Sequence, residues 1–440
     1  MDFDSMIEEI KKDYVSPQSL GLRTTKKVIK GEVEEYVKSC RYNVHLILTN
    51  HHKFESLVWD NFSSSVYFEG QKLTNHLITE LCIWFEKVYQ ITIQEADFRK
   101  VLHLVANQNP VHLLEEFLDS FNEAYPEKNG WDGVPRLETL LIKYFGVQDT
   151  KLTRAYSKKF FIGAIRRALY STLEKPVKKD ESLILYGTQG IGKTMAVKAL
   201  ALQERWFSNE ELDIKSKDSY YKIHGKLLYE VGEWAGRTKD HNQQKNWQTK
   251  TIDRFRPVSA TYQVEIPRKV SFIITTNEMN LFTDPSGSRR YWPVRCGYDY
   301  TRNKAGEIVG VAWAPHKKIN VVELEKIAPQ VWLEARFLAN ETKEDGTQKH
   351  IHYLTPTEEE ARKESNKLYN SSHPWEEAVL REIDSLGGRA TVNMIMNNMG
   401  LPYYEQNRKS KTIIESILQQ NEYKKCRFRI VGTIVRGWKK

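Results

Sequence analysis

The sequence predicts a multidomain α/β protein, and three patterns in its 440 residues indicate this. A glycine-rich stretch, LILYGTQGIGKT (residues 183–194), joins an apolar strand-like run to a helical run. From residue 183 to about residue 296, β-rich runs alternate with helical stretches, as in a parallel sheet covered by helices. After residue 373, three helical patterns precede two β-prone runs. A central α/β domain is therefore expected between two smaller domains.

The composition fits a folded protein without membrane spans. Apolar residues make up 40% and charged residues 28% of the chain, and no apolar run approaches the length of a span. The beginning, MDFDSMIEEIKKDY, lacks the basic and apolar regions of a signal peptide. The four cysteines have no CxxC spacing, which argues against a disulfide framework or zinc site and fits the reducing cytoplasm.

The net charge of +9 is concentrated near the C-terminus. Residues 401–440 hold ten Lys and Arg residues against three Glu residues. Such a basic segment indicates a polyanionic partner, and nucleic acid is the first candidate.

Composition shifts divide the chain into five segments. Residues 1–125 are expected to form an α+β accessory domain, with VHLILT and SSVYFEG as strands, LITELCIWFEKVYQ as a helix and RTTKKVIKG as a basic connector. The Pro, Gly and Asp residues of YPEKNGWDGVPRL mark a break. A helical collar (126–180), an ATPase core (181–340), an exposed polar linker (341–372) and a winged helix-turn-helix (373–440) are expected to follow.

The stretch GTQGIGKT matches the Walker A pattern of a phosphate-binding loop. Its glycines let backbone N–H groups face phosphate oxygens, and the following helix adds its dipole. Lys193 is expected to reach the β- and γ-phosphates of ATP, and the Thr194 hydroxyl to bind Mg²⁺. The predicted nucleotide-binding residues are Gly187, Thr188, Gln189, Gly190, Ile191, Gly192, Lys193 and Thr194.

Two carboxylates and an amide follow later strands. Glu230 and Glu233 come after the apolar run in KLLYEVGEW, where an ATPase needs one acid on the metal and one to align water. We assign Glu230 to the metal and Glu233 to the water, with the reverse assignment left open. Asn277 ends the strand KVSFIITTN and is expected to sense the γ-phosphate; the alternative is an ordinary turn residue.

Arg289 and Arg290 follow that strand in DPSGSRRYWPV. In ring ATPases a neighbouring subunit supplies such a guanidinium to the γ-phosphate. A surface pair of arginines would show the same sequence.

Two segments are candidates for DNA contact. The predicted hairpin TIDRFRPVSATYQVEIPRKV (residues 251–270) is basic and aromatic, which suits a nucleic-acid backbone, although an ordinary hairpin with a solvated charged face is the alternative. In the C-terminal segment, EQNRKSKTIIES would be the groove helix, unless that segment only packs on the ring or on a partner protein. The candidate DNA-binding residues are Arg256, Tyr262, Arg268, Lys269, Gln406, Asn407, Arg408, Lys411, Arg427 and Arg429.

These motifs, in this order, resemble the virulence-associated protein E family. The family comprises P-loop ATPases of phages and mobile genetic islands, similar to superfamily 3 and MCM-like AAA+ helicases. The resemblance covers roughly residues 43–335 and rests on NGWDGVPRLETLL, GTQGIGKT, YEVGEW, DRFRPVSATY, PRKVSFIITTNEMNLFTDPSGSRRYWPV and QVWLEA. The last part of the chain is also similar to the winged-helix extension of replicative helicases from staphylococcal and related islands.

The resemblance implies an AAA+ core that forms a ring, with a hexamer expected, and shares each ATP site between neighbours. It implies that Lys193, Thr194, Glu230, Glu233 and Asn277 work in one site and that Arg289 or Arg290 acts on the neighbouring one. The hairpin would be a pore loop on one DNA strand, and the C-terminal domain would touch duplex origin DNA. The chain has no primase signature, so a primase would be a separate protein, alongside host replication proteins.

Three functions remain open at this point. The first is a helicase that starts replication of a mobile element. The second is a sequence-specific initiator or regulator that uses ATP only to assemble. The third is a small-molecule kinase, which the basic C-terminal segment and the paired arginines disfavour.

Overall fold

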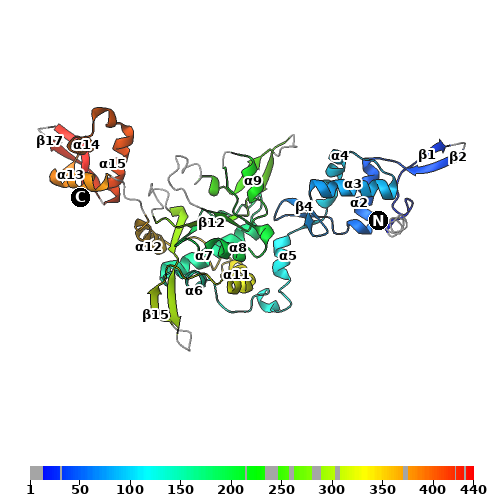
Figure 1. Cartoon of the computed structure of the whole chain (residues 1–440), viewed down its shortest axis with the longest axis horizontal. Coiled ribbons are helices and arrows are strands. Elements are labelled where there is room, and N and C mark those ends of the chain that lie inside the picture. Colours follow the sequence, from blue (N-terminus) through cyan, green and yellow to red (C-terminus); the bar gives the residue numbers. More distant parts are fainter. Residues whose placement is uncertain are drawn as a thin grey trace.

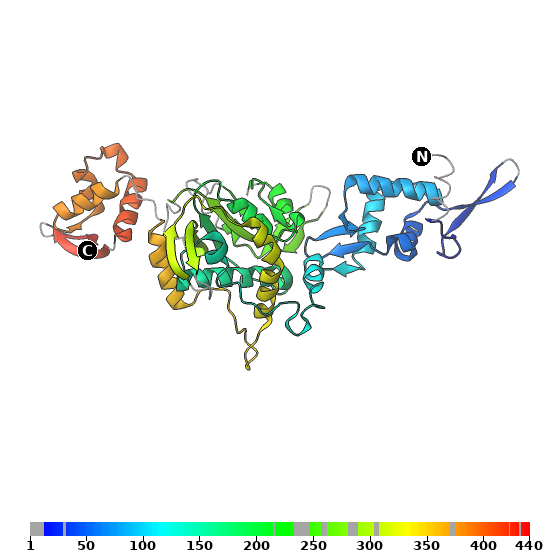
Figure 2. The ribbon, with the colours of Figure 1, turned by 60° about the horizontal axis from the view of Figure 1, so that its bottom comes forward.

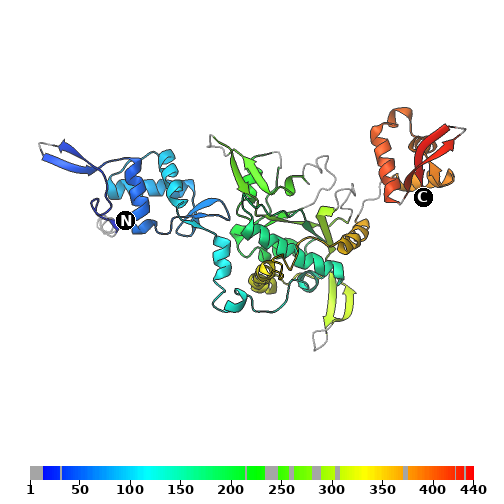
Figure 3. The same cartoon turned by 180° about the vertical axis from the view of Figure 1, so that it is seen from behind.

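The computed structural model shows three units that follow one another along the long axis of the molecule (Figure 1). They are the N-terminal unit (residues 13–111), the central unit (112–369) and the C-terminal unit (375–440), and the view from behind shows the same order (Figure 3). The structure describes residues 13–29, 32–213, 216–232, 246–256, 262–279, 289–302, 308–369, 375–421, 423–430 and 433–440. The three units have separate cores and combine helices with parallel or antiparallel sheets, so the protein is a multidomain α/β chain. Among the described residues, no helix is long and apolar enough to cross a bilayer.

The N-terminal unit packs helices against a small sheet in the order β5-β4-β3-β6. Its core is apolar and aromatic, with Phe85 and Phe98 fully buried between helices. The helices are α2 (Arg41–Asn50), α3 (Asn75–Tyr89), α4 (Glu95–Ala106) and the short η1 (His52–Phe54). The strands are β1 (Thr24–Ile29), β2 (Glu32–Val37), β3 (Val58–Asp60), β4 (Ser65–Phe68), β5 (Gln71–Lys72) and β6 (Pro110–Val111).

Two sequence predictions for this unit are wrong, and two are confirmed. VHLILT lies in helix α2, where Val44, Ile47 and Leu48 face the core at helical spacing, because a short apolar run does not separate strand from helix. RTTKKVIKG is not a connector: it contributes β1, which pairs with β2 in a hairpin that extends away from the unit (Figure 2). The predicted strand in SSVYFEG is β4, and the predicted helix in LITELCIWFEKVYQ is α3.

The central unit is built on a five-stranded sheet in the order β13-β7-β12-β9-β8. All neighbouring strands are parallel, so their carboxyl ends meet at one edge. Strand β12 is buried along its whole length, as expected for the middle of a parallel sheet. The strands are β7 (Ser182–Tyr186), β8 (Phe207–Ser208), β9 (Leu228–Val231), β12 (Ser271–Thr276) and β13 (Tyr291–Arg295), and the four predicted β-rich runs contain β7, β9, β12 and β13.

Long helices hold this sheet in the largest core of the protein. Helix α7 is buried on nearly every side and packs against α11, whose Trp332 donates a hydrogen bond to the Leu200 carbonyl at 2.6 Å. The helices are α5 (Leu113–Asp119), α6 (Leu140–Phe145), α7 (Lys151–Tyr170), α8 (Lys193–Leu200), α9 (Asp218–Ile223), α11 (Val321–Asn340), α12 (Pro356–Lys367), η2 (Pro126–Lys128) and η3 (Glu204–Trp206).

Two hairpins extend from the central unit. The predicted hairpin of residues 251–270 is confirmed as β10 (Ile252–Phe255) paired antiparallel with β11 (Val264–Pro267). The second hairpin pairs β14 (Tyr298–Arg302) with β15 (Ile308–Trp313).

The stretch 341–372 was expected to be an exposed linker, but in its described part (341–369) it is folded onto the central unit. It contains helix α12, which begins with a capping box at Thr355 and packs on α7. Lys159 of α7 bonds Glu358 at 2.5 Å, and Tyr369 is buried against Tyr186. The polar composition therefore reflects a helix with one buried face.

The C-terminal unit has a separate core of its own. Ile383, Ile395, Ile414 and Trp438 pack together between three helices and a sheet in the order β16-β18-β17. The elements are α13 (Glu376–Ser385), β16 (Arg389–Ala390), α14 (Val392–Asn398), η5 (Tyr403–Glu405), α15 (Arg408–Gln420), β17 (Lys424–Ile430) and β18 (Thr433–Lys439). The three predicted helices and the predicted β-hairpin are thus confirmed.

A buried ion pair fixes the base of the β10–β11 hairpin. The Arg268 Nε lies 3.1 and 3.0 Å from the carboxylate oxygens of Asp253, and both side chains are fully buried. Arg268 also donates to the Trp247 carbonyl, and its own carbonyl accepts from Arg167 at 3.1 Å.

The expected DNA contacts of Arg268 and Lys269 are corrected by this geometry. The guanidinium of Arg268 is enclosed by protein and neutralised by Asp253. Lys269 turns toward the N-terminal unit and donates to the Asn61 carbonyl at 2.9 Å. Burial lowers the pKa of Lys269 to about 8. Neither side chain faces solvent, so neither is available to DNA. Both stabilise the fold through buried bonds instead.

We expect Arg268→Ala to lower the free energy of unfolding of the central unit by about 3–5 kcal/mol, since it leaves Asp253 buried and unpaired. Denaturation followed by tryptophan fluorescence measures this, because Trp247 lies against Arg268. Arg254→Ala is the matched control: Arg254 pairs with Glu265 on the exposed side of the same hairpin, and its loss should cost about 1 kcal/mol or less. If the two substitutions lowered the free energy of unfolding equally, Arg268 would not be the buried partner that stabilises the hairpin base.

The buried His112, at the junction between the N-terminal and central units, should make the stability of the protein depend on pH. Burial, reinforced by Lys269, lowers the pKa of His112 to about 4. Between this value and the ordinary histidine pKa, the unfolded chain binds a proton on His112 and the folded chain does not. The free energy of unfolding should therefore fall as the pH drops from about 6.5 to about 4. His112→Asn keeps an acceptor for the Glu115 N–H but does not titrate. Unfolding free energies across this range should fall less steeply in the variant; parallel curves would refute the prediction.

Candidate functional site

The glycine-rich loop leaves β7 at the carboxyl edge of the central sheet and enters α8 at Lys193. Gly190 and Gly192 have φ of +80° and +97°, values that other residues rarely adopt. Two contacts fix the loop from outside: the Gly187 N–H donates to the Thr276 carbonyl at 3.1 Å, and the Ile319 N–H donates to the Ile191 carbonyl at 2.9 Å. The loop is thus a defined turn that presents the first turn of α8.

Lys193 lies over the loop with its ammonium against backbone carbonyls. Its Nζ donates to the carbonyl of Gly187 at 2.6 Å and to that of Thr188 at 2.9 Å. Burial lowers the pKa of Lys193 from its ordinary value. A lysine held in this way carries a charge that an anion on the loop could neutralise.

Glu230 lies beneath the start of α8 and joins two hydroxyl groups. Its Oε1 accepts from Thr194 at 2.7 Å and from Thr275 at 2.6 Å. The side chain is almost completely buried, and Oε2 has no hydrogen-bond partner among the described residues. An unpaired carboxylate oxygen beside hydroxyl oxygens is the kind of donor set that suits Mg²⁺, which keeps several waters and needs few protein ligands.

The remaining predicted catalytic residues take different places. Asn277 is exposed and follows Thr276, so it lies beside the loop. Glu233 is outside the residues that the structure describes. Thr275 was not predicted as a site residue; its place two residues before Asn277, near the end of the run KVSFIITTN, was the available signal.

Arg289 and Arg290 lie at the opposite end of the sheet from the loop of their own chain. They precede β13, whose Tyr291 pairs in parallel with Ser182 at the amino end of β7. At about 3.3 Å per residue, the two ends of the five-residue strand β7 are roughly 13 Å apart. Arg289 is exposed, and the Arg290 Nε is buried without a hydrogen-bond partner among the described residues.

On the β10–β11 hairpin, two candidate DNA contacts are available. Arg256 is exposed, and Tyr262 is 82% exposed. Residues 257–261 between them lie outside the described part of the chain.

In the C-terminal unit, Gln406 and Asn407 have structural roles within the unit, and their contact with DNA stays a prediction. The Gln406 amide donates to Asn397 and to the Leu401 carbonyl, both at 2.9 Å. Asn407 accepts from the Ser410 N–H at 3.1 Å and so caps α15. Arg408 and Lys411 on α15 are exposed, as are Arg427 and Arg429 on β17.

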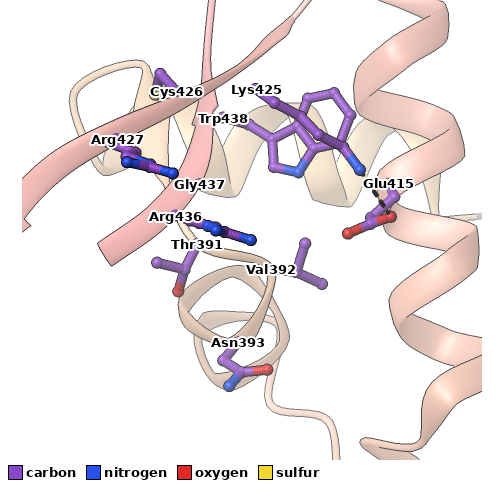
Figure 4. Close-up of a pocket in the computed structure, with 10 residues that line it drawn as sticks. All are labelled: Thr391, Val392, Asn393, Glu415, Lys425, Cys426, Arg427, Arg436, Gly437 and Trp438. Atoms are coloured by element: carbon purple, nitrogen blue, oxygen red, sulfur yellow. Dashed lines mark ion pairs between the residues drawn. The ribbon is translucent and has the colours of Figure 1, made fainter. Parts of the chain in front are cut away.

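A basic groove of about 620 Å³ lies between the β17–β18 hairpin and the helices (Figure 4). Arg427 and Arg436 are direct cross-strand partners, and both are drawn on the groove side of the hairpin. Lys425 lies over the Trp438 ring and pairs with Glu415 at 3.5 Å. Arg436 was not among the predicted contacts, although a tight hairpin around Gly432 would have placed it opposite Arg427.

We expect Arg436→Thr to stabilise the hairpin by about 0.2–1 kcal/mol, because like charges directly opposite each other repel. The substitution should also weaken binding of a polyanion such as heparin. Hydrogen exchange of the β17 and β18 amides measures the first effect, and the gain should shrink in high salt, which screens the repulsion. A variant that is less stable at low salt would show that the two guanidinium groups do not repel each other.

Comparison with known proteins places the chain in a family. No curated protein matches its sequence. Two solved apo structures of the C-terminal region of NrS-1 are distantly similar: one has 15% identity and a TM-score of 0.43, covering 87% of this chain and 95% of the other. The second has 16% identity and a TM-score of 0.40, covering 86% and 95%. The model of the virulence-associated protein E-like domain matches residues 127–371, more than half of the chain, and the protein therefore belongs to this family.

Proposed function

We propose that the protein is an ATP-driven DNA helicase that initiates replication of a phage or mobile genetic element. The observation that carries the proposal is the contact of Glu230 with Thr194 and Thr275. It brings a buried carboxylate to the first turn of α8, next to Lys193 and a glycine-rich loop. Phosphoryl transfer needs these groups together: a cradle for phosphates, a lysine, and oxygen ligands for a metal.

In this proposal the loop from Gly187 to Thr194 binds the phosphates of ATP. Lys193 leaves the carbonyls of Gly187 and Thr188 for the β- and γ-phosphates. Thr194 and the free oxygen of Glu230 would hold Mg²⁺, which would supply charge neutralisation to the phosphates. Asn277, at the mouth of the loop, would orient the attacking water, and Glu233 would accept its proton.

The positions of Arg289 and Arg290 favour a ring. At the amino end of β13 they are too far from the phosphate loop of their own chain to act there. An arginine that acts on a neighbour's site belongs in such a place, since the neighbour's loop approaches from outside. We therefore propose head-to-tail subunits, with six as the number that the family resemblance implies.

DNA would be bound at two places. Arg256 and Tyr262 on the exposed side of the β10–β11 hairpin would grip one strand in the ring, with the tyrosine stacking on a base. The C-terminal unit would act as a winged helix whose α15 presents Arg408 and Lys411 and whose hairpin presents Arg427 and Arg429. A separate primase and host replication proteins would complete the machinery.

The second candidate function is a DNA-binding initiator that uses ATP only to assemble. The separate core and the basic groove of the C-terminal unit favour it, because such a unit could bind an origin without any motor. The two functions differ in whether hydrolysis is coupled to strand separation.

We expect the wild-type protein to displace a strand from forked DNA in ATP and Mg²⁺, and Lys193→Ala to abolish this activity. Glu230→Gln is the second variant: it keeps the size of the side chain but weakens a metal ligand, so hydrolysis should fall at least about 100-fold, which corresponds to roughly 3 kcal/mol of barrier. Lys198→Ala, also on α8 but half-buried and paired with Glu204, is the control that should keep activity.

Strand displacement on forks of both polarities decides between the functions. DNA-stimulated hydrolysis without displacement on any fork would refute the helicase and leave the initiator. Hydrolysis that persists in Lys193→Ala would refute the site itself.

A further inference from the structure

The β1–β2 hairpin extends from the N-terminal unit into solvent in all three views (Figures 1, 2 and 3). Its base is held firmly by one buried amide. The Asn43 side chain accepts from the Arg23 N–H at 2.8 Å and donates to the carbonyls of Arg23 and Lys38 at 2.7 and 2.8 Å. Because both ends of the hairpin are bonded to the same side chain of α2, its direction is set by the unit beneath it.

Among the residues that the structure describes, nothing pairs with either edge of this hairpin. Within them, β1 and β2 form a two-stranded sheet with no third strand. Val28 and Val33 are cross-strand partners and are 72% and 65% exposed. An isolated hairpin of this kind is marginally stable in water, and open strand edges are templates for pairing.

Charge is separated between the two strands. β1 carries Lys26 and Lys27 and no acidic residue, whereas β2 carries Glu32, Glu34 and Glu35 and no basic residue. Among the described residues, neither lysine forms an ion pair with these glutamates: Lys27 lies over the Tyr36 ring, and Glu34 and Glu35 accept from Tyr36 and Thr24. Lys26 and Lys27 stand directly opposite Glu35 and Glu34 in the hairpin. One strand is thus basic and the other acidic, and each would also present its charges to a strand added at its open edge.

We propose that the hairpin pairs edge to edge with the hairpin of a second copy of this chain, β1 of one against β2 of the next. A two-fold pairing would place β1 against β1, or β2 against β2, and oppose like charges. A cyclic, head-to-tail pairing opposes lysines to glutamates at every junction and keeps neighbouring strands antiparallel. Repeated around a ring, it pairs every open edge.

The charge balance favours a second copy over nucleic acid as the occupant. The segment from Thr24 to Val37 has three Lys and three Glu residues, so its net charge is zero. A polyanion would gain nothing from the acidic edge. The ring in which the hairpins would pair rests on the proposed function, whereas the evidence for pairing comes from the hairpin alone.

Charge reversal tests the pairing on the full-length protein. Lys26→Glu/Lys27→Glu makes both strands acidic, and Glu34→Lys/Glu35→Lys makes both basic. Each variant alone should associate at least about tenfold more weakly than wild type in sedimentation velocity with ATP and Mg²⁺ at low salt. An equimolar mixture should recover assembly, because each junction then joins an acidic strand to a basic one.

The mixture also separates pairing from folding. Within each chain of the mixture the two strands still carry like charges, so a defect caused by a misfolded hairpin would not be rescued. The four-fold variant Lys26→Glu/Lys27→Glu/Glu34→Lys/Glu35→Lys should assemble like wild type. Three results would each overturn the pairing. They are a wild-type chain that stays monomeric, a one-strand charge-reversal variant that assembles normally by itself, and a mixture of the two variants that fails to assemble.

The pairing and the helicase fail differently. A ring that survives both reversals removes the hairpin's role but leaves the helicase intact. A rescued mixture whose rings never displace a strand supports the pairing and counts against the helicase.

Discussion

The carboxylate of Glu230 is the contact on which the candidate site depends. It lies one residue before the end of strand β9, accepts from Thr275 of β12, and accepts from Thr194 in the first turn of α8. Three segments far apart in the sequence are thereby joined at one edge of the sheet. Because the carboxylate is buried, its hydrogen bonds are strong and its unpaired oxygen is costly. A bound cation would remove that cost, and this is the physical argument behind the proposed nucleotide site.

The same sheet links the site to the hairpin that faces solvent. β11 ends at Pro267 and β12 begins at Ser271, so Arg268 and Lys269 lie between the hairpin and the strand that carries Thr275. Arg268 locks the hairpin base to Asp253, and Lys269 reaches the N-terminal unit at Asn61. Arg268 and Lys269 therefore tie the amino end of β12, opposite the end that carries Thr275, to the hairpin base and to the N-terminal unit.

The sequence was informative wherever local pattern decides structure. The glycine-rich loop, the buried strands around it and the helices of the C-terminal unit follow from short-range periodicity and glycine placement. Long-range burial was not readable in this way. Arg268 looks like a surface cation in sequence, but Asp253 and Trp247 enclose it only once the sheet has formed. VHLILT is short and apolar, and its neighbours in space made it a helix. Asn407 directly precedes a helix, where asparagine is a preferred cap, and the partners of Gln406, Asn397 and Leu401, come close to it only in the folded unit.

The proposed site is best tested by a structure with Mg²⁺ and a non-hydrolysable ATP analogue. We expect a triphosphate on the loop, with Lys193 moved from the carbonyls of Gly187 and Thr188 to the phosphates. We also expect a metal ion bonded to the Thr194 hydroxyl on the side of Glu230, at about 2.1 Å from the oxygen. A nucleotide bound elsewhere, with Lys193 still on those carbonyls and Glu230 still bonded only to its two threonines, would contradict the proposed site.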